Sequence, residues 1–290
     1  MSNILLFGAT GHAGRAIARE LHSRGHAVTA VVRDEQKARR LLWGIDHFVV
    51  AEATQPDTLQ GICASQEIVV SALGKSVSPN DWSRPSFEEV DFQGNMNILA
   101  EAKASGVQQF VYLSAFGAEQ MRQLTYFRVH DDFSKALQSS GLHYAIVQPP
   151  AIMSAFLDLV KMARSGWLMT IGGGQYRTNP ISEYDLAKIC ADLIGQPNTV
   201  LAAGGQRIYT RQEINLIIQK LTAPHKKVRS IPLWLVRSAL PFWKIANRNM
   251  YDKLAFFTEV MEHDLLAPQV GTISLEDYFT LDKTTGPAPS

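Results

Sequence analysis

The feature that most constrains the fold lies near the N-terminus, where an apolar run enters a glycine-rich turn. Residues 4–7 are apolar, glycines follow at positions 8, 11 and 14, and residues 15–21 favour a helix. A strand that ends in such a turn and opens a helix aims unpaired backbone N–H groups, with the positive end of the helix dipole, at an anion. Residues 3–14 therefore predict a strand–turn–helix unit with a phosphate site at the turn.

The three glycines have different expected roles. Gly8 allows the sharp turn, Gly11 allows the backbone to approach a pyrophosphate, and Gly14 allows the helix to pack against the strand. A tight turn between strand and helix can also use glycine without any ligand, but a second apolar strand at 27–32 favours a dinucleotide site. The predicted cofactor contacts in the turn are Gly8, Thr10, Gly11, His12, Ala13 and Gly14.

The end of the second strand indicates which cofactor binds. In NAD sites an acidic residue about 20 positions beyond the glycines binds the ribose 2′-hydroxyl, whereas an arginine accommodates a 2′-phosphate. Arg33 stands at this point, and Asp34 lies one residue late, where it can turn outward to cap the next helix. We therefore predict NADP(H), with Lys37 or Arg39 as helpers; the alternative is that Arg33 is only a solvated strand end.

Apolar runs alternate with helical stretches over the first half of the chain. This alternation predicts an α/β fold, a doubly wound parallel Rossmann sheet. The expected strands are 3–7, 27–32, 46–50, 67–71, 109–113 and 143–148, and the clearest helix is 86–105. We expect a dinucleotide-binding domain over 1–150 and a smaller, mainly helical substrate region over 151–290, interleaved with the Rossmann core around 180–205.

Composition narrows the choice of partner and compartment. The formal net charge is +1 and no basic stripe is interleaved with aromatics, so we expect no nucleic-acid partner. The two cysteines, Cys63 and Cys190, lie far apart in the sequence, each among apolar residues. We expect both to be reduced and to pack in the core. No basic segment precedes the first apolar run, so a cytoplasmic location is expected, and no metal site is predicted.

The segment 231–262 is rich in bulky apolar residues. Basic and acidic residues interrupt it too often for a transmembrane span. Lining of a substrate pocket or a subunit interface is the expected use, and the second of these would make the chain a homo-oligomer. A helix lying on a membrane surface is the less favoured alternative.

Several motifs together resemble the atypical, extended-like short-chain dehydrogenases, and lean toward their NmrA-like branch. They are the glycine turn with Arg33, the runs 69–74 and 111–115, Asn95, the run 139–149, the segment 179–187 and, more loosely, 267–279. The resemblance implies a Rossmann fold whose fourth strand ends along the cofactor, at Ala72, Leu73 and Gly74. It also implies either a reductase or a cofactor-sensing regulator.

The same resemblance implies a catalytic tyrosine, a lysine four residues later and an upstream serine. Tyr126 and Ser114 match, but the lysine position holds His130. Residues four apart share a helix face, so His130 can still reach toward the ribose. A histidine is largely neutral at neutral pH, so most of the charge that would activate Tyr126 is lost. Lys135 lies on another face and is a poor substitute.

Two further positions concern the nicotinamide and the substrate. Gln148 stands where the family usually carries arginine, while Pro149 remains an expected neighbour of the nicotinamide ring. Residues 151–156, Met153 especially, are expected to face the substrate.

These observations predict an NADP(H)-dependent reductase of a small apolar carbonyl, enone or quinone. Hydride transfer needs only the nicotinamide and a positioned acceptor, so loss of the lysine does not exclude catalysis. The alternative is a regulatory protein that senses NADP(H) and turns over nothing. A nucleotide-sugar epimerase comes third, because Arg33 and the missing lysine disfavour it.

Overall fold

The computed structural model describes residues 1–45 and 47–285, and the chain forms two compact units. Unit 1 comprises residues 1–76, 83–148 and 183–202. Unit 2 comprises residues 77–82, 149–182 and 203–290. Each unit therefore collects separate stretches of the chain.

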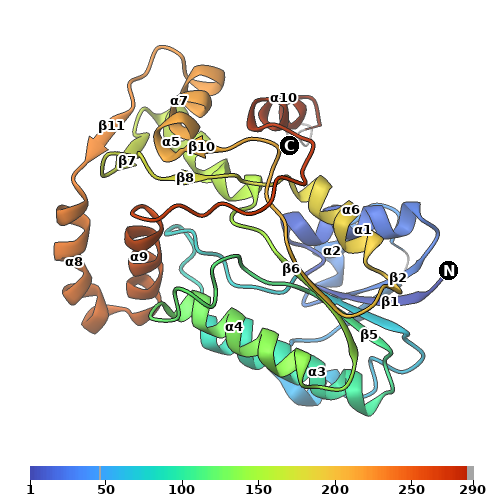
Figure 1. The fold of residues 1–290 in the computed structure, drawn as a ribbon. Coiled ribbons are helices and arrows are strands. Elements are labelled where there is room, and N and C mark those ends of the chain that lie inside the picture. Colours follow the sequence, from blue (N-terminus) through green and yellow to red (C-terminus); the bar gives the residue numbers. More distant parts are fainter. Residues whose placement is uncertain (46, 286–290) are drawn as a thin grey trace. The chain divides into compact units, whose positions relative to one another are not determined.

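Unit 1 is built on a seven-stranded parallel sheet with strand order β3-β2-β1-β4-β5-β6-β9 (Figure 1). The strands are β1 (Asn3–Phe7), β2 (Ala27–Val32), β3 (His47–Val50), β4 (Ile68–Ser71), β5 (Gln109–Leu113), β6 (His143–Gln148) and β9 (Thr199–Ala202). Their apolar runs are nearly continuous because helices cover both faces of a parallel sheet. The predicted doubly wound fold and its six strands are confirmed; residue 46, placed at the start of the third, lies outside the described residues.

The helices of unit 1 lie on both faces of this sheet. They are α1 (His12–Ser23), α2 (Glu35–Leu41), α3 (Asn95–Ala104), α4 (Thr125–Gln138) and α6 (Glu183–Asp192), with short helical turns η1 (Pro56–Leu59) and η2 (Glu88–Gly94). Figure 1 shows α1 and α6 on one face and α3 and α4 on the other. The buried core beneath α3 and α4 includes Leu5, Ile98, Phe110 and Phe133.

The expected helix 86–105 contains one departure from regular geometry. Its first part, η2, is a π-helix, and regular α-helix begins only at Asn95. A π-helical turn shifts the residues on either side relative to an α-helix and is frequent at functional sites. Here it contains Asp91, whose side chain is fully buried.

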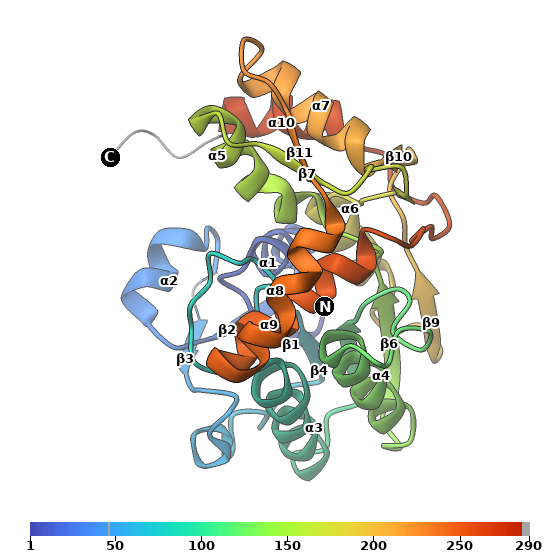
Figure 2. The ribbon, with the colours of Figure 1, turned by 90° about the vertical axis from the view of Figure 1, so that its left-hand side faces the viewer.

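Unit 2 is mainly helical, with two small sheets (Figure 2). Its helices are η3 (Met153–Phe156), α5 (Leu157–Ser165), α7 (Arg211–Thr222), α8 (Leu233–Ala246), α9 (Arg248–Val260) and α10 (Leu275–Thr285). Its strands are β7 (Met169–Ile171), β8 (Arg177–Thr178), β10 (Tyr209–Thr210) and β11 (Arg229–Ile231), paired as β11 with β7 and β10 with β8. Within residues 1–45 and 47–285, every helix is too short or too polar to cross a bilayer.

Candidate functional site

The order of strands in unit 1 locates the candidate cofactor site. β1 lies between β2 and β4. The chain runs from β1 through β2 to β3 on one side, then crosses to β4 and continues on the other side, so the order of the strands reverses beside β1. Ligands of open α/β sheets bind outside the carboxyl ends of the strands at such a switch point. The glycine turn after β1 and the residues that follow β4 both lie there.

Gly8 and Gly14 are required by the fold itself. Gly8 has φ +71°, and a Cβ on it would lie 2.3 Å from the carbonyl oxygen of Ala72. A Cβ on Gly14 would lie 2.0 Å from the carbonyl oxygen of Gly8. The turn, the helix and the end of β4 therefore approach each other more closely than any larger residue permits.

Gly11 is different, because the protein does not fill the space beside it. A Cβ at this position would meet only the carbonyl oxygen of Gly8, at 3.3 Å, and Gly11 is exposed with Thr10 and His12. Gly11 is also the N-cap of α1 and offers no side-chain hydrogen bond to the helix N-terminus. The first N–H groups of a helix have no intrahelical carbonyl partner. The turn therefore fits the pyrophosphate of a dinucleotide, since it combines such donors with an open cradle that a Cβ would fill.

The residues after β4 border this turn. The backbone N–H of Ala72 donates to the carbonyl of Phe7, the last residue of β1, at 3.1 Å. Ala72 and Leu73 are half-buried and Gly74 is exposed. Ala72 and Leu73 thus lie beside the glycine turn at the carboxyl end of the sheet, and Gly74 follows them in the chain.

Arg33 and Asp34 lie at the end of β2 and have separate roles. The Asp34 side chain accepts a hydrogen bond from the backbone N–H of Lys37 at 3.0 Å and caps α2, as predicted. The Arg33 side chain is 79% exposed, and its Nη1 lies 3.7 Å from Glu52 Oε2. That separation exceeds the 2.7–2.9 Å typical of a charge-assisted hydrogen bond, so the guanidinium is available to an anion. Arg39 instead pairs with Glu35 at 2.7 Å.

Tyr126 and His130 lie one turn apart on α4. Their rings meet edge to face with centroids 4.7 Å apart, and the Phe87 ring also meets the Tyr126 ring edge to face, with centroids 5.6 Å apart. The His130 side chain is buried rather than directed outward to a ribose. Its Nδ1 lies 2.6 Å from the Tyr112 hydroxyl, and its Nε2 lies 3.5 Å from Asp91 Oδ1.

Burial sets the protonation of this cluster. Desolvation lowers the pKa of His130 to about 4 and raises the pKa of Asp91 to about 8. Hydrogen bonding from the Lys75 backbone and the Lys75 charge oppose the rise at Asp91 but do not cancel it. Desolvation, with a smaller contribution from Asp91, also raises the pKa of Tyr126 well above its ordinary value. Asp91, His130 and Tyr126 are therefore neutral at pH 7.

Ser114 is buried directly after β5. Its hydroxyl lies 3.2 Å from the hydroxyl of Ser134, which in turn donates to the backbone carbonyl of His130 at 2.7 Å. Lys135, already expected to be a poor substitute for the missing lysine, pairs instead with Asp131 at 2.8 Å.

The expected substrate-facing positions fall in unit 2. Met153 is 1% exposed and packs in the hydrophobic core of that unit, and its role in facing the substrate stays a prediction. Pro149, also buried, is the first residue of the same stretch. Gln148, the last residue of β6, instead lines a cavity of about 90 Å³ with residues 116–120 of unit 1.

Two segments that resemble the family have a structural role in unit 2. The Asn179 side chain donates to the carbonyl of Ala267 at 2.7 Å and accepts from its N–H at 3.0 Å. A Cβ on Gly204 would lie 2.0 Å from the Asn179 Nδ2. These residues hold the C-terminal segment to the loop before α6.

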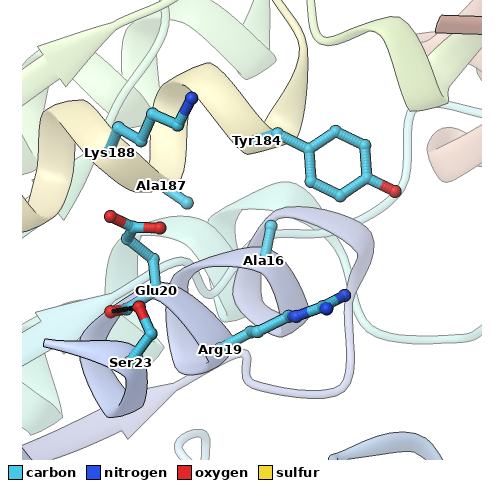
Figure 3. Close-up of a pocket in the computed structure, with 7 residues that line it drawn as sticks. All are labelled: Ala16, Arg19, Glu20, Ser23, Tyr184, Ala187 and Lys188. Atoms are coloured by element: carbon cyan, nitrogen blue, oxygen red, sulfur yellow. Dashed lines mark hydrogen bonds between the residues drawn. The ribbon is translucent and has the colours of Figure 1, made fainter. Parts of the chain in front are cut away.

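A separate hollow of about 180 Å³ lies between α1 and α6 (Figure 3). Tyr184, Ala187 and Lys188 of α6 line it, opposite residues of α1 that include Arg19 and Glu20. None of the predicted site residues lines it, so the hollow does not bear on the candidate site.

Asp91, Tyr112 and Arg15 were not identified from the sequence. Asp91 and Tyr112 meet His130 only because η2 and β5 pack against α4, and no local spacing signals this. Arg15 Nη2 lies 3.0 Å from His12 Nδ1 in the first turn of α1. Because Arg15 directly follows the third glycine, the sequence alone indicates that a cation borders the turn.

A family model described as NAD(P)H-binding matches residues 8–197. The divinyl chlorophyllide a 8-vinyl-reductase of Arabidopsis thaliana is 28% identical, over 98% of this chain and 74% of that protein. The photosystem II assembly factor Ycf39 of Trieres chinensis is 24% identical, over 88% of this chain and 80% of that protein.

Among solved structures, the NADPH-dependent quinone oxidoreductase of Escherichia coli, complexed with NADPH, has a similar fold. It superposes with a TM-score of 0.73 at 19% identity, over 96% of this chain and 99% of that one. At this identity the likeness concerns the fold.

Proposed function

Because the chain belongs to the NAD(P)H-binding family, we propose that it is an NADP(H)-dependent reductase of a small apolar carbonyl, enone or quinone. Reductases occur among both its relatives and its structural neighbours, which supports this class of reaction. A cytoplasmic location is part of the proposal and is supported by two buried, free cysteines, which suit a reducing compartment.

The residues that would hold the cofactor are those of the glycine turn, the end of β4 and Arg33. Pyrophosphate oxygens would accept hydrogen bonds from the turn and the α1 N-terminus. The choice of NADP(H) over NAD(H) rests on Arg33: its guanidinium is exposed, and the neighbouring carboxylate of Asp34 is engaged as a helix cap. When bound, the nicotinamide supplies a hydride.

The reductive direction is supported by one observation, the contact of Tyr126 with a neutral His130. Reduction of a carbonyl leaves an oxygen that must gain a proton, and a phenol with a raised pKa carries that proton throughout the neutral range. Oxidation would need Tyr126 ionised, which an adjacent cation favours and a buried neutral imidazole does not. In this proposal Ser114 supports the region through Ser134, and His130 positions Tyr126 rather than charging it.

The test follows NADPH consumption with a panel of apolar quinones, enones and aldehydes. Tyr126→Phe is expected to lower turnover at least 100-fold while NADPH affinity stays nearly unchanged, because the hydroxyl acts only in the chemical step. Tyr184→Phe, at an exposed tyrosine of α6, is the matched control and should keep full activity. Unchanged turnover in Tyr126→Phe would assign the proton to water or to another residue.

A cofactor-sensing regulator is the second candidate, and the burial of His130 favours it. The position that carries a lysine in the catalytic pattern holds a residue whose ring nitrogens face Tyr112 and Asp91. A regulator would bind NADPH, consume none with any acceptor, and change its affinity for a protein partner when NADPH is added. Measurable turnover by the unmodified protein excludes this alternative.

A further inference from the structure

Helix α8 of unit 2 exposes large apolar side chains along its whole length. None of its residues is buried, and Trp234, Phe242 and Ile245 are 68%, 65% and 92% exposed. Leu235 is 50% exposed. Isolated apolar residues on a surface are common, whereas a contiguous set on one element marks an interaction surface.

The four exposed side chains share one face of the helix. At about 100° per residue, Trp234, Leu235, Phe242 and Ile245 fall within an arc of about 100°. The half-buried residues of α8 fall on the other side of the helix, and α8 packs against α9 (Figure 1). We call the four exposed residues the apolar arc. Ser238, which lies within it, donates its hydroxyl to the carbonyl of Leu235, so the arc presents little polar surface.

The charged residues in the stretch of sequence that contains α8 all have one sign. From residue 226 to residue 251 the sequence contains six cations and no Asp or Glu. They are Lys226, Lys227, Arg229, Arg237, Lys244 and Arg248. Without these six, the 28 Lys and Arg of the chain would be outnumbered by its 27 Asp and Glu, so the positive excess is concentrated here.

Acidic neighbours compensate only part of this charge. Arg237 pairs with Glu262, and Arg248 with Asp252 at 3.3 Å, both carboxylates coming from α9 or its end. Lys244 lies over the ring of Tyr251 at 6.0 Å, and Arg229 over the exposed ring of Trp167 at 4.7 Å. A cation beside an exposed tryptophan, as at Arg229 and Trp167, matches the interface of a bilayer, where indole rings and basic side chains gather at the headgroups.

We propose that α8 docks on the surface of an anionic lipid bilayer. The apolar arc lies at the boundary between headgroups and acyl chains, parallel to the surface, and the surrounding cations face the lipid phosphates. A helix with a Trp- and Phe-bearing face beside Lys and Arg has the chemistry of an interfacial helix. An acidic protein partner is less suited, since the arc offers few polar groups to fix the orientation of such a partner.

The test uses the full-length protein and sedimentation with two kinds of vesicle, phosphatidylcholine alone and phosphatidylcholine mixed with phosphatidylglycerol. Binding is expected to the mixed vesicles, to be at least tenfold weaker to the neutral ones, and to fall as salt is added, because the attraction is partly electrostatic. No binding to mixed vesicles, or equal binding to both kinds at every salt concentration, would overturn the proposal.

Matched variants separate the two contributions. Trp234→Gln with Phe242→Gln should weaken binding at least tenfold, whereas Trp43→Gln, at a tryptophan 91% exposed in unit 1, should not. Lys227→Gln with Lys244→Gln should weaken binding to mixed vesicles severalfold, and Lys103→Gln with Lys188→Gln should not. Circular dichroism and NADPH titration verify that each variant is folded.

Two other outcomes of the same experiment would assign the arc differently. If light scattering shows a dimer that the Trp234→Gln, Phe242→Gln variant dissociates, and vesicles bind neither form, the arc is an interface with a second copy of this chain. If binding falls equally in the Trp43→Gln control, the arc is not the docking surface. Either result contradicts the membrane assignment.

Discussion

Arg33 and Asp34 are adjacent but have different roles: Arg33 is proposed to recognise the cofactor, and Asp34 caps helix α2. Arg33→Ala is expected to weaken NADPH binding about tenfold or more and to change NADH binding little, because a charge-assisted hydrogen bond contributes roughly 1.5–3 kcal/mol. Isothermal titration with both cofactors measures this difference. Arg40→Ala, at an exposed arginine in the last turn of α2, is the control and should keep the preference. Equal affinity of the unmodified protein for the two cofactors would contradict the assignment.

Because Asp91 is buried, we expect the free energy of unfolding to depend on pH. Its folded-state pKa of about 8 lies above the ordinary 3.8, so between these values the folded protein holds a proton that the unfolded chain has released. Stability attributable to Asp91 therefore falls as pH rises toward 8. For His130, with a folded-state pKa of about 4 against 6.5, stability rises with pH between those values. Between pH 4 and 6.5 the contributions of Asp91 and His130 to the pH dependence of stability oppose each other. Above pH 6.5 only the contribution of Asp91 remains.

Between pH 6.5 and 8 the free energy of unfolding should thus fall, at most by about 1.4 kcal/mol per pH unit for one proton. Asp91→Asn should remove most of this slope, because an amide cannot ionise. Urea unfolding at both pH values measures it, and Asp57→Asn, at an exposed carboxylate, should retain the slope of the unmodified protein. An equally steep slope in Asp91→Asn would place its origin in another group.

At the scale of elements, the β1–α1 turn separates the requirements of the fold from those of the ligand. Gly11→Val is expected to abolish NADPH binding while leaving the fold intact, because the space beside Gly11 is open in the protein alone. Gly14→Val should instead destabilise the whole unit, since its Cβ would overlap the carbonyl of Gly8. Circular dichroism and NADPH titration, read together, distinguish the two variants.

If a folded Gly11→Val protein bound NADPH normally, the pyrophosphate would lie elsewhere. If Gly14→Val were as stable as the unmodified protein, the close approach of α1 to the turn would not be essential.

The elements of unit 1 were predictable from sequence where a local pattern specifies them. Strands such as β1 and β6 are apolar runs with clear ends, and the Asp34 cap follows from its position before a helix. Other features depend on packing between distant segments. Examples are the π-helical turn η2, the inward orientation of the His130 side chain and the burial of Met153. These features arise from contacts between distant segments, so neither spacing nor composition reveals them.

At the scale of the molecule, unit 1 is completed by a segment far from its N-terminal half. β9 pairs with β6, and α6 packs against α1. Both β9 and α6 lie beyond residue 182. A fragment of residues 1–150 is therefore expected to unfold without cooperativity, because β6 becomes an open edge and α1 loses its cover. A fragment of residues 1–205 contains every part of unit 1 and should unfold cooperatively in thermal circular dichroism. Cooperative unfolding of the shorter fragment would show that α6 and β9 are dispensable.

The same connectivity has a consequence during synthesis. The ribosome completes β6 at Gln148 but must add all residues up to Ala202 before β9 can cover its edge. At about 5–20 residues per second this takes roughly 3–10 s, during which a nascent sheet presents an unpaired apolar strand. Translation speed over residues 149–202, and chaperones that shield a strand edge in that interval, should therefore govern how much of the newly made protein escapes aggregation.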